Sequence, residues 1–181
     1  MTYRPFTAYE NFIYLSRYSR WREDKGRREI WPETVTRVIN AFKKQVNENE
    51  QVPWGAIENA ILNRDVVPSM RVMMAAGPAL DNNHIAAYNC SFLDIDSYDA
   101  FPEALYVLMH GTGLGFSVKE ESISKLPKFL QFNGKKVHYK IADSKEGWRD
   151  SVAVACDLIS MGYEVYFDYS AIRPEGARLK T

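Results

Sequence analysis

Apolar residues recur at helical spacing through the first third of the chain, and this pattern predicts a run of helices. One helix is predicted to begin at Trp31-Pro32, because proline suits the first helical turn. Its apolar stripe consists of Val35, Val38, Ile39, Phe42 and Val46. A second helix is predicted from Pro53-Trp54, and a short one over 70–76, where Gly77-Pro78 is a stop signal. Residues 1–65 are therefore predicted to form an N-terminal helical region.

From residue 66 to residue 181, short apolar strands alternate with helical patterns, which is typical of an α/β fold. The predicted strands are an apolar run through Cys90, the segment after Gly111, and the segments 137–141 and 163–169. One predicted helix covers 100–110 and buries Phe101, Leu105, Leu108 and Met109. Another is capped by Asp143, stops at Gly162 and buries Trp148, Val152, Cys156 and Ile159. The segments 81–84 and 122–134 are predicted loops.

Residues 1–30 interleave aromatic and basic side chains, a pattern that can bind nucleic acid by stacking and charge. The alternative is a helix over 9–20 that packs on the core, followed by an exposed loop over 22–26. Glu23, Asp24 and Glu29 dilute the positive charge of this region, so we favour the packing interpretation.

The composition argues against several classes of protein. Lysine plus arginine equal aspartate plus glutamate at 23 each, so the net charge does not indicate a nucleic acid or an anionic membrane as partner. No apolar run approaches the length that spans a bilayer, and residues 1–5 lack the apolar core of a signal peptide. Two distant cysteines do not make a disulfide scaffold, which indicates a reducing cytoplasm. The three histidines show no metal-ligand spacing with either cysteine, so we expect no metal site.

The stretch from Tyr88 to Val118 carries the candidate chemistry. It begins with Cys90 in an apolar run and ends with a glycine-rich turn, Gly111-Thr112-Gly113, that leads into a strand. One helix-length segment separates the two, so we expect the turn to return beside the cysteine. A thiol can exchange electrons, and glycines let a ligand approach the backbone. The alternative for Cys90 is a small buried hydrophobe, which is also our prediction for Cys156.

Neither of two familiar phosphate-binding motifs is present. The glycines of the turn follow a helix and precede a strand, the reverse of the dinucleotide-binding order, and no Gly-Lys-Ser/Thr follows as in a Walker motif. Ser69 precedes the short helix over 70–76 and has two interpretations. It could cap that helix, and, as an extension of that role, it could contact a phosphate.

An opening signature and six further motifs, all in register, give the chain a resemblance to a known family. The opening signature consists of residues 18–21, 25–28 and 31–35. The six motifs are Pro68-Ser69, Asn89-Cys90, 111–118, Ile123-Ser124, 143–148 and 172–176. In these residues the chain resembles the N-terminal part of ribonucleotide reductases, most closely the adenosylcobalamin-dependent (class II) ribonucleoside triphosphate reductases of the monomeric type.

The resemblance implies the first part of a ten-stranded α/β barrel, which surrounds a finger loop that carries a thiyl radical. In this family the radical removes the ribose 3′ hydrogen, the 2′ hydroxyl leaves as water, and a cysteine pair supplies two electrons. Cys90 matches the first cysteine of that pair, and Ser69, Asn89 and Gly113 match substrate contacts. The implied cofactor is adenosylcobalamin. The implied partners are a ribonucleotide, a thioredoxin-like reductant and a complementary C-terminal reductase polypeptide.

The chain also departs from the family. Members usually have a triple glycine or Gly-Ser-Gly at 111–113, and the segment 119–140 is shorter than in the monomeric enzymes, where an insertion helps form the effector site. The radical cysteine, the second cysteine of the pair and most cobalamin contacts lie beyond Thr181 in the family. We therefore expect a piece of an enzyme: a naturally split chain, the product of an intein-interrupted gene, or a truncated form. The alternative is a non-catalytic regulatory fragment that binds a nucleotide or a partner chain.

Overall fold

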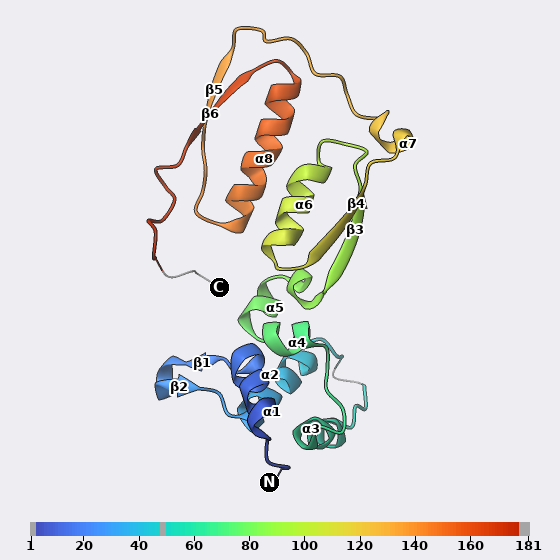
Figure 1. Ribbon diagram of the computed structural model, residues 1–181, viewed down its shortest axis with the longest axis vertical. Coiled ribbons are helices and arrows are strands. Elements are labelled where there is room, and N and C mark those ends of the chain that lie inside the picture. The colour runs from blue at the N-terminus through green and yellow to red at the C-terminus, as the bar shows by residue number, and fades with distance from the viewer. Residues whose placement is uncertain (1–2, 48–49, 178–181) are drawn as a thin grey trace. The chain divides into compact units, whose positions relative to one another are not determined.

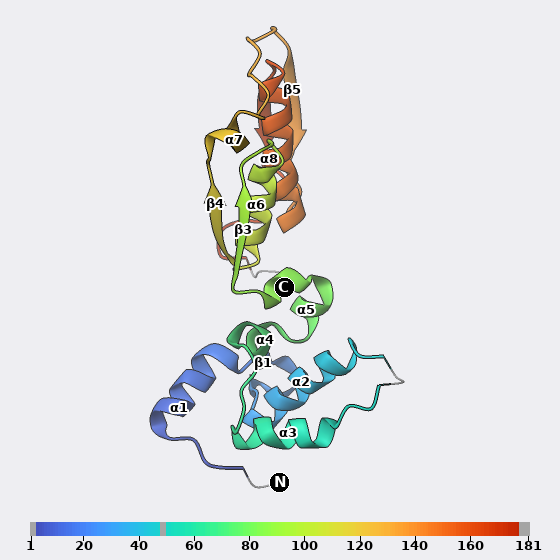
Figure 2. The same cartoon turned by 90° about the vertical axis from the view of Figure 1, so that its right-hand side faces the viewer.

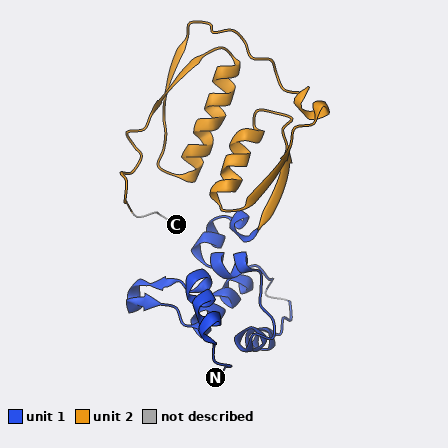
Figure 3. Cartoon of the chain, in the orientation of Figure 1, with its two compact units in different colours: residues 1–88, 181 blue, residues 89–180 orange. Residues whose placement is uncertain are grey.

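A computed structural model describes residues 3–47 and 50–177 of the chain. The chain divides into two compact units, residues 1–88 and residues 89–180 (Figure 3). The predicted boundary between residues 65 and 66 separates an N-terminal helical region from the first portion of a barrel. That boundary stays a prediction.

The first unit is built from short helices and one small hairpin (Figures 1 and 2). Its helical elements are α1 (Ala8–Ile13), the π-helical turn η1 (Tyr14–Tyr18), α2 (Trp31–Lys43), α3 (Trp54–Asn63), α4 (Met70–Ala75), α5 (Pro78–Asn82) and the 3₁₀ turn η3 (His84–Ala87). The hairpin consists of β1 (Trp21–Arg22), the 3₁₀ turn η2 (Glu23–Lys25) and β2 (Arg27–Arg28). The helices predicted to begin near residues 31, 54 and 70 are all present, whereas the predicted loop over 81–84 is partly helical.

Helix α2 lies at the centre of the first unit's core because its apolar stripe faces inward. Val35, Val38 and Ile39 are at most 1% exposed, as the helical spacing predicts. Burial of side chains of this size stabilises a fold by about 1.5–3 kcal/mol each. The start of the helix is fixed by the Glu33 carboxylate, which accepts a hydrogen bond from the backbone N–H of Ile30 (3.0 Å).

The chain before α2 differs in detail from the predicted helix over 9–20 and the predicted loop over 22–26. Helix α1 ends at Ile13, and the backbone continues as η1, where the Tyr14 hydroxyl donates to the backbone carbonyl of Glu29 (2.8 Å). The predicted loop is the β1–β2 hairpin, which Gly26 closes in a left-handed conformation (φ 58°). The prediction of a helical segment followed by an exposed turn is thus largely confirmed. It missed the change to a π-helical turn at Tyr14 and the two-residue strands on either side of the exposed turn.

The second unit consists of two β–α–β units, and both strand pairs are parallel (Figure 1). The first contains β3 (Cys90–Asp94), α6 (Ala100–Met109) and β4 (Gly113–Ser117). The second contains β5 (Lys136–Lys140), α8 (Lys145–Ser160) and β6 (Glu164–Asp168). Helix α7 (Glu120–Ile123) lies in the chain between these two β–α–β units. Helix α6 packs against α8. The α/β class predicted for this part is confirmed, but among the described residues each sheet has two strands and no continuous barrel wall is formed.

The helices of the second unit leave exposed several side chains that were predicted to be buried. Phe101 and Leu108 of α6 are 42% and 51% exposed, and Trp148 and Ile159 of α8 are 38% and 46% exposed. Because each helix covers a sheet of only two strands, part of its apolar stripe has no partner in this unit. No helix in the described part of the chain is long and apolar enough to cross a lipid bilayer.

The start of α8 differs from the predicted cap. The Ser144 hydroxyl, and not the Asp143 carboxylate, accepts the capping hydrogen bond from the backbone N–H of Gly147 (2.9 Å). Asp143 instead pairs with Arg173 (3.0 Å). Gly147 is needed at this position, because a Cβ there would lie 2.1 Å from the carbonyl oxygen of Ala142.

Candidate functional site

The β3–β4 pair brings together three of the four predicted site residues. Cys90 is the first residue of β3 and lies opposite Gly113, the first residue of β4. The backbone N–H of Gly113 donates to the carbonyl oxygen of Asn89 (2.8 Å). Asn89, Cys90 and Gly113 are all exposed. The expected return of the glycine-rich turn beside the cysteine is confirmed.

The turn into β4 depends on its two glycines. Gly111 has a φ of 78°, a left-handed conformation that side chains disfavour. A Cβ on Gly113 would lie 3.4 Å from the carbonyl oxygen of Asn89, so the backbones of the two strands approach closely there. Thr112 between them is 2% exposed and anchors the turn. The surface beside Cys90 is therefore backbone without a side chain.

Ser69 belongs to the first compact unit, so the structure does not group it with the other three residues. It occupies the position before α4, and its carbonyl oxygen accepts a hydrogen bond from the backbone N–H of Met73 (2.9 Å). Its hydroxyl makes no capping hydrogen bond within the described part of the chain, and the residue is exposed. The side-chain cap is thus not observed, and the phosphate contact stays a prediction.

The two thiols have different environments. Cys90 is exposed, whereas Cys156 is partly buried in α8, and neither forms a disulfide. Burial raises the pKa of the Cys156 thiol, and the negative charges of Asp157 and Asp99 raise it further. Because the thiolate is the reactive form, this shift lowers the reactivity of Cys156. The contrast favours Cys90 as the reactive thiol.

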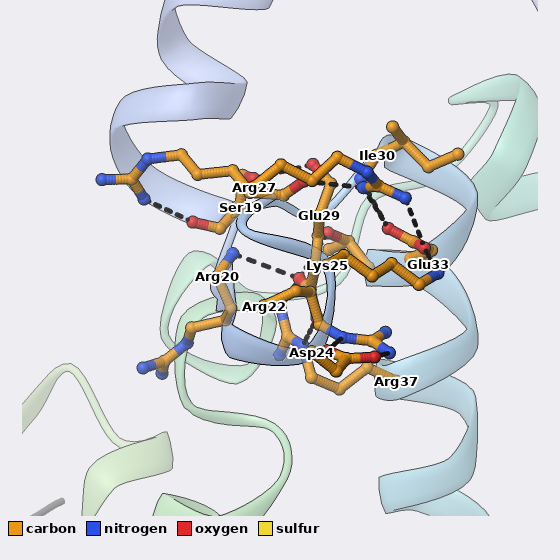
Figure 4. Close-up of polar contacts among 12 residues, drawn as sticks. Ser19, Arg20, Arg22, Asp24, Lys25, Arg27, Glu29, Ile30, Glu33 and Arg37 are labelled. Atoms are coloured by element: carbon orange, nitrogen blue, oxygen red, sulfur yellow. Dashed lines mark hydrogen bonds and ion pairs between the residues drawn. The ribbon is translucent and has the colours of Figure 1, made fainter.

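A buried charge network in the first unit was not predicted from the sequence (Figure 4). Glu29 is 4% exposed and accepts two hydrogen bonds from the Arg37 guanidinium (2.9 and 3.0 Å) and one from the Thr34 hydroxyl (2.8 Å). Burial raises the pKa of Glu29, but the hydrogen bonds and charge of Arg37 outweigh that effect and hold the pKa below its ordinary value. Arg37 also donates to the backbone carbonyls of Tyr18, Met73 and Ala76.

A second set of ion pairs attaches the hairpin to α2. The Glu33 carboxylate accepts hydrogen bonds from both terminal nitrogens of Arg27 (2.9 and 3.0 Å) and from the ammonium group of Lys25. Together with the backbone N–H of Ile30, these donors hold the pKa of Glu33 well below its usual range. Both networks join α2 to the chain segments that precede it within the first unit.

Known proteins resemble the chain in sequence. The ribonucleotide reductase alpha domain family matches residues 2–70. The adenosylcobalamin-dependent ribonucleoside-triphosphate reductase of Euglena gracilis is 27% identical over an alignment that covers 97% of this chain and 27% of the relative. The reductase of the same name from Lactobacillus gasseri is 26% identical, over 92% of this chain and 32% of the relative. The chain is homologous to the N-terminal part of class II ribonucleotide reductases.

A solved structure agrees with the chain in fold. The crystal structure of a B-12 dependent (class II) ribonucleotide reductase matches with a TM-score of 0.79 at 23% identity, and the match covers 93% of this chain and 33% of that chain. The chain thus spans about a third of the length of the reductases it matches. The alignment with the Lactobacillus gasseri enzyme extends over 242 residues, more than the 181 of this chain, so that relative has internal residues without a counterpart here.

Proposed function

We propose that the chain forms the N-terminal part of a class II reductase that converts ribonucleoside triphosphates to deoxyribonucleotides, and that Cys90 is one thiol of its redox pair. One observation carries the proposal. In a chain homologous to these reductases, an exposed thiol is held opposite Gly113 on a parallel strand pair, beside bare backbone. The names of the relatives, ribonucleoside-triphosphate reductases, support the substrate class.

The proposed redox step uses Cys90 and a second thiol from a complementary polypeptide. The two thiols lose two electrons and two protons and form one disulfide. At the substrate the C2′–O bond breaks, a hydrogen takes the place of the hydroxyl group, and the oxygen leaves as water. A dithiol reductant of the thioredoxin class then exchanges with the disulfide and restores both thiols.

Three further residues are proposed to contact the substrate. Asn89 has amide donors and an amide acceptor next to the thiol. Gly113 leaves the β4 backbone open beside Cys90, so a nucleotide can approach it closely. Ser69 has an exposed hydroxyl that can donate to a phosphate oxygen.

The cofactor is proposed to be held mostly outside this chain. The relatives are named adenosylcobalamin-dependent, and this cofactor supplies radical chemistry when it is bound. Cys90 and Gly113 lie on an exposed strand face that Asn89 directly precedes, and this surface does not by itself enclose a group of that size. We therefore propose that the complementary polypeptide provides most of the cobalamin contacts, while this chain provides the face that carries Cys90.

Reconstitution with the complementary polypeptide tests the proposal. The chain alone is expected to form no deoxyribonucleotide, because the second thiol and the radical-bearing segment come from its partner. In the assembled enzyme, Cys90→Ser abolishes repeated turnover with a dithiol reductant. The matched variant Cys156→Ala keeps turnover and loses only about 1 kcal/mol of stability.

The disulfide formed in one turnover without reductant decides the assignment. Mass mapping is expected to find Cys90 bridged to a cysteine of the partner. If Cys156 is bridged and Cys90 is free, the redox assignment is wrong. If the assembled chains bind nucleotide but form neither product nor disulfide, the chain is the non-catalytic regulatory fragment that the sequence also allows.

A further inference from the structure

Phe92 shares the exposed strand face of Cys90. Successive side chains of a strand point to opposite faces, and Phe92 follows Cys90 by two residues in β3. Phe92 is 66% exposed, so its ring is available for contact. A strand rises by about 3.3 Å per residue, so the two side chains are separated by about 6.6 Å along β3.

On this face the neighbouring strand, β4, has two glycines and therefore no side chains opposite Cys90 and Phe92. Gly113 lies opposite Cys90, and Gly115 lies opposite Phe92. A Cβ placed on Gly115 would lie 3.4 Å from Cδ2 of Phe92, so the ring leans over the backbone of that glycine. The face therefore has a floor of β4 backbone, with the thiol at one end and the aromatic ring at the other.

A negative charge distinguishes the two ends of this strand face. Asp94 follows Phe92 by two residues and is exposed on the same face. Its carboxylate repels a phosphate group. This repulsion favours an orientation in which the phosphates of a nucleotide lie away from Asp94, at the Cys90 end of β3, and its base lies at the Phe92 end.

We propose that the base of the substrate nucleotide packs against Phe92 while its ribose lies beside Cys90. This inference rests on the proposed function, because it takes the redox thiol as the position of the ribose. Gly115 is required for this packing, because a larger side chain at that position would occupy the space above the β4 backbone or displace the Phe92 ring. Aromatic rings stack on every base, so Phe92 sets affinity more than base identity.

Protection of Cys90 from iodoacetamide tests the inference in the assembled enzyme. CTP is the probe, and peptide mapping reads the alkylation of Cys90 separately from that of other thiols. Phe92→Leu keeps an apolar side chain but removes the ring, and it is expected to raise the CTP concentration for half-protection about tenfold. Phe92→Tyr keeps the wild-type value. Gly115→Val fills the floor and loses protection although Phe92 is present.

Phe116→Leu is the matched control. Phe116 is 63% exposed, close to the value for Phe92, but it lies opposite Leu93 and therefore on the other face of the strand pair. Its replacement leaves the half-protection concentration unchanged. Circular dichroism checks the fold of each variant, and if Phe92→Leu does not fold, Gly115→Val and Phe92→Tyr decide the question.

The outcomes separate this inference from the proposed function. Equal protection in the wild type and in Phe92→Leu overturns the inference, as does an equal loss in Phe116→Leu or no protection of the wild type by CTP. Formation of deoxycytidine triphosphate is measured in parallel. Turnover without an effect of Phe92 means that the inference alone fails, whereas protection that depends on Phe92 without turnover means that the proposed function alone fails.

Discussion

Replacement of Arg37 by methionine is expected to leave a buried carboxylate unpaired. The side chains of Glu29 and Arg37 are only 4% and 15% exposed. The guanidinium makes two hydrogen bonds to Glu29 and three to backbone carbonyl groups, and methionine supplies none of these donors. Removal of one partner of a buried ion pair costs about 3–5 kcal/mol. That loss is a large part of the roughly 5–15 kcal/mol that stabilises a typical domain.

Urea unfolding followed by far-ultraviolet circular dichroism measures this loss. With a slope of about 1–3 kcal/mol per molar urea, the midpoint falls by at least about 1 M. Lys44→Met is the control, because the Lys44 ammonium group also pairs with a carboxylate, that of Asp81 at 2.6 Å, but its side chain is 59% exposed. Such an exposed pair is worth about 0–1 kcal/mol. Equal losses in the two variants would refute the argument from burial.

The pH dependence separates lost charge pairing from lost packing. In the wild type the folded pKa of Glu29 is lowered, so its stabilisation is fully present above the ordinary glutamate pKa of about 4.3 and is lost as the pH falls through the folded value. In Arg37→Met, burial without the cation raises the pKa of Glu29. As the pH falls, protonation of Glu29 removes the cost of the buried, unpaired carboxylate in this variant. The stability difference should therefore shrink from pH 7 to pH 4. A constant difference would indicate packing alone.

Other outcomes concern the second unit. Gly147→Ala is expected to cost about 1–3 kcal/mol, because its Cβ would lie 2.1 Å from the carbonyl oxygen of Ala142; a wild-type urea midpoint contradicts this. At pH 8, iodoacetamide should alkylate Cys90 of the isolated chain faster than Cys156, which is less exposed and has a raised pKa; mass spectrometry compares the two rates, and equal rates contradict this. The isolated chain should self-associate through the free edges of its two-stranded sheets. Analytical ultracentrifugation measures this: a monomeric isolated chain whose sedimentation does not change when the complementary polypeptide is added contradicts the prediction.

Local sequence determined most of the elements and the centre of the candidate site. Pro32 and the apolar stripe after it are enough to predict α2, because both act within a few turns of one helix. A helix between two short strands in one sheet places the strands side by side and parallel. Recognising the helix over 100–110 therefore predicts that the glycine-rich turn returns beside Cys90, whereas the register that pairs Cys90 with Gly113 is an observation of the structure.

Several local alternatives were settled only by contacts with distant residues. Asp143 and Ser144 can both cap a helix, and the choice depends on Arg173, which lies thirty residues further on and engages Asp143. The buried pair of Glu29 and Arg37 had no signal in the sequence, because Glu29 precedes α2 and Arg37 lies outside its apolar stripe. The burial of Arg37 depends on the backbone carbonyl groups that α4 and η1 place within hydrogen-bond distance of its guanidinium.

Tertiary structure also decided which side chains are covered. Helical spacing shows that Phe101 and Leu108 belong to the apolar stripe of α6, but a spacing does not specify what lies against that stripe. Phe92 is exposed for a related reason: strand alternation fixes its face, and the glycines of the neighbouring strand leave that face open. Periodicity arises within one element, whereas burial arises between elements, so sequence alone predicts the first and only packing determines the second.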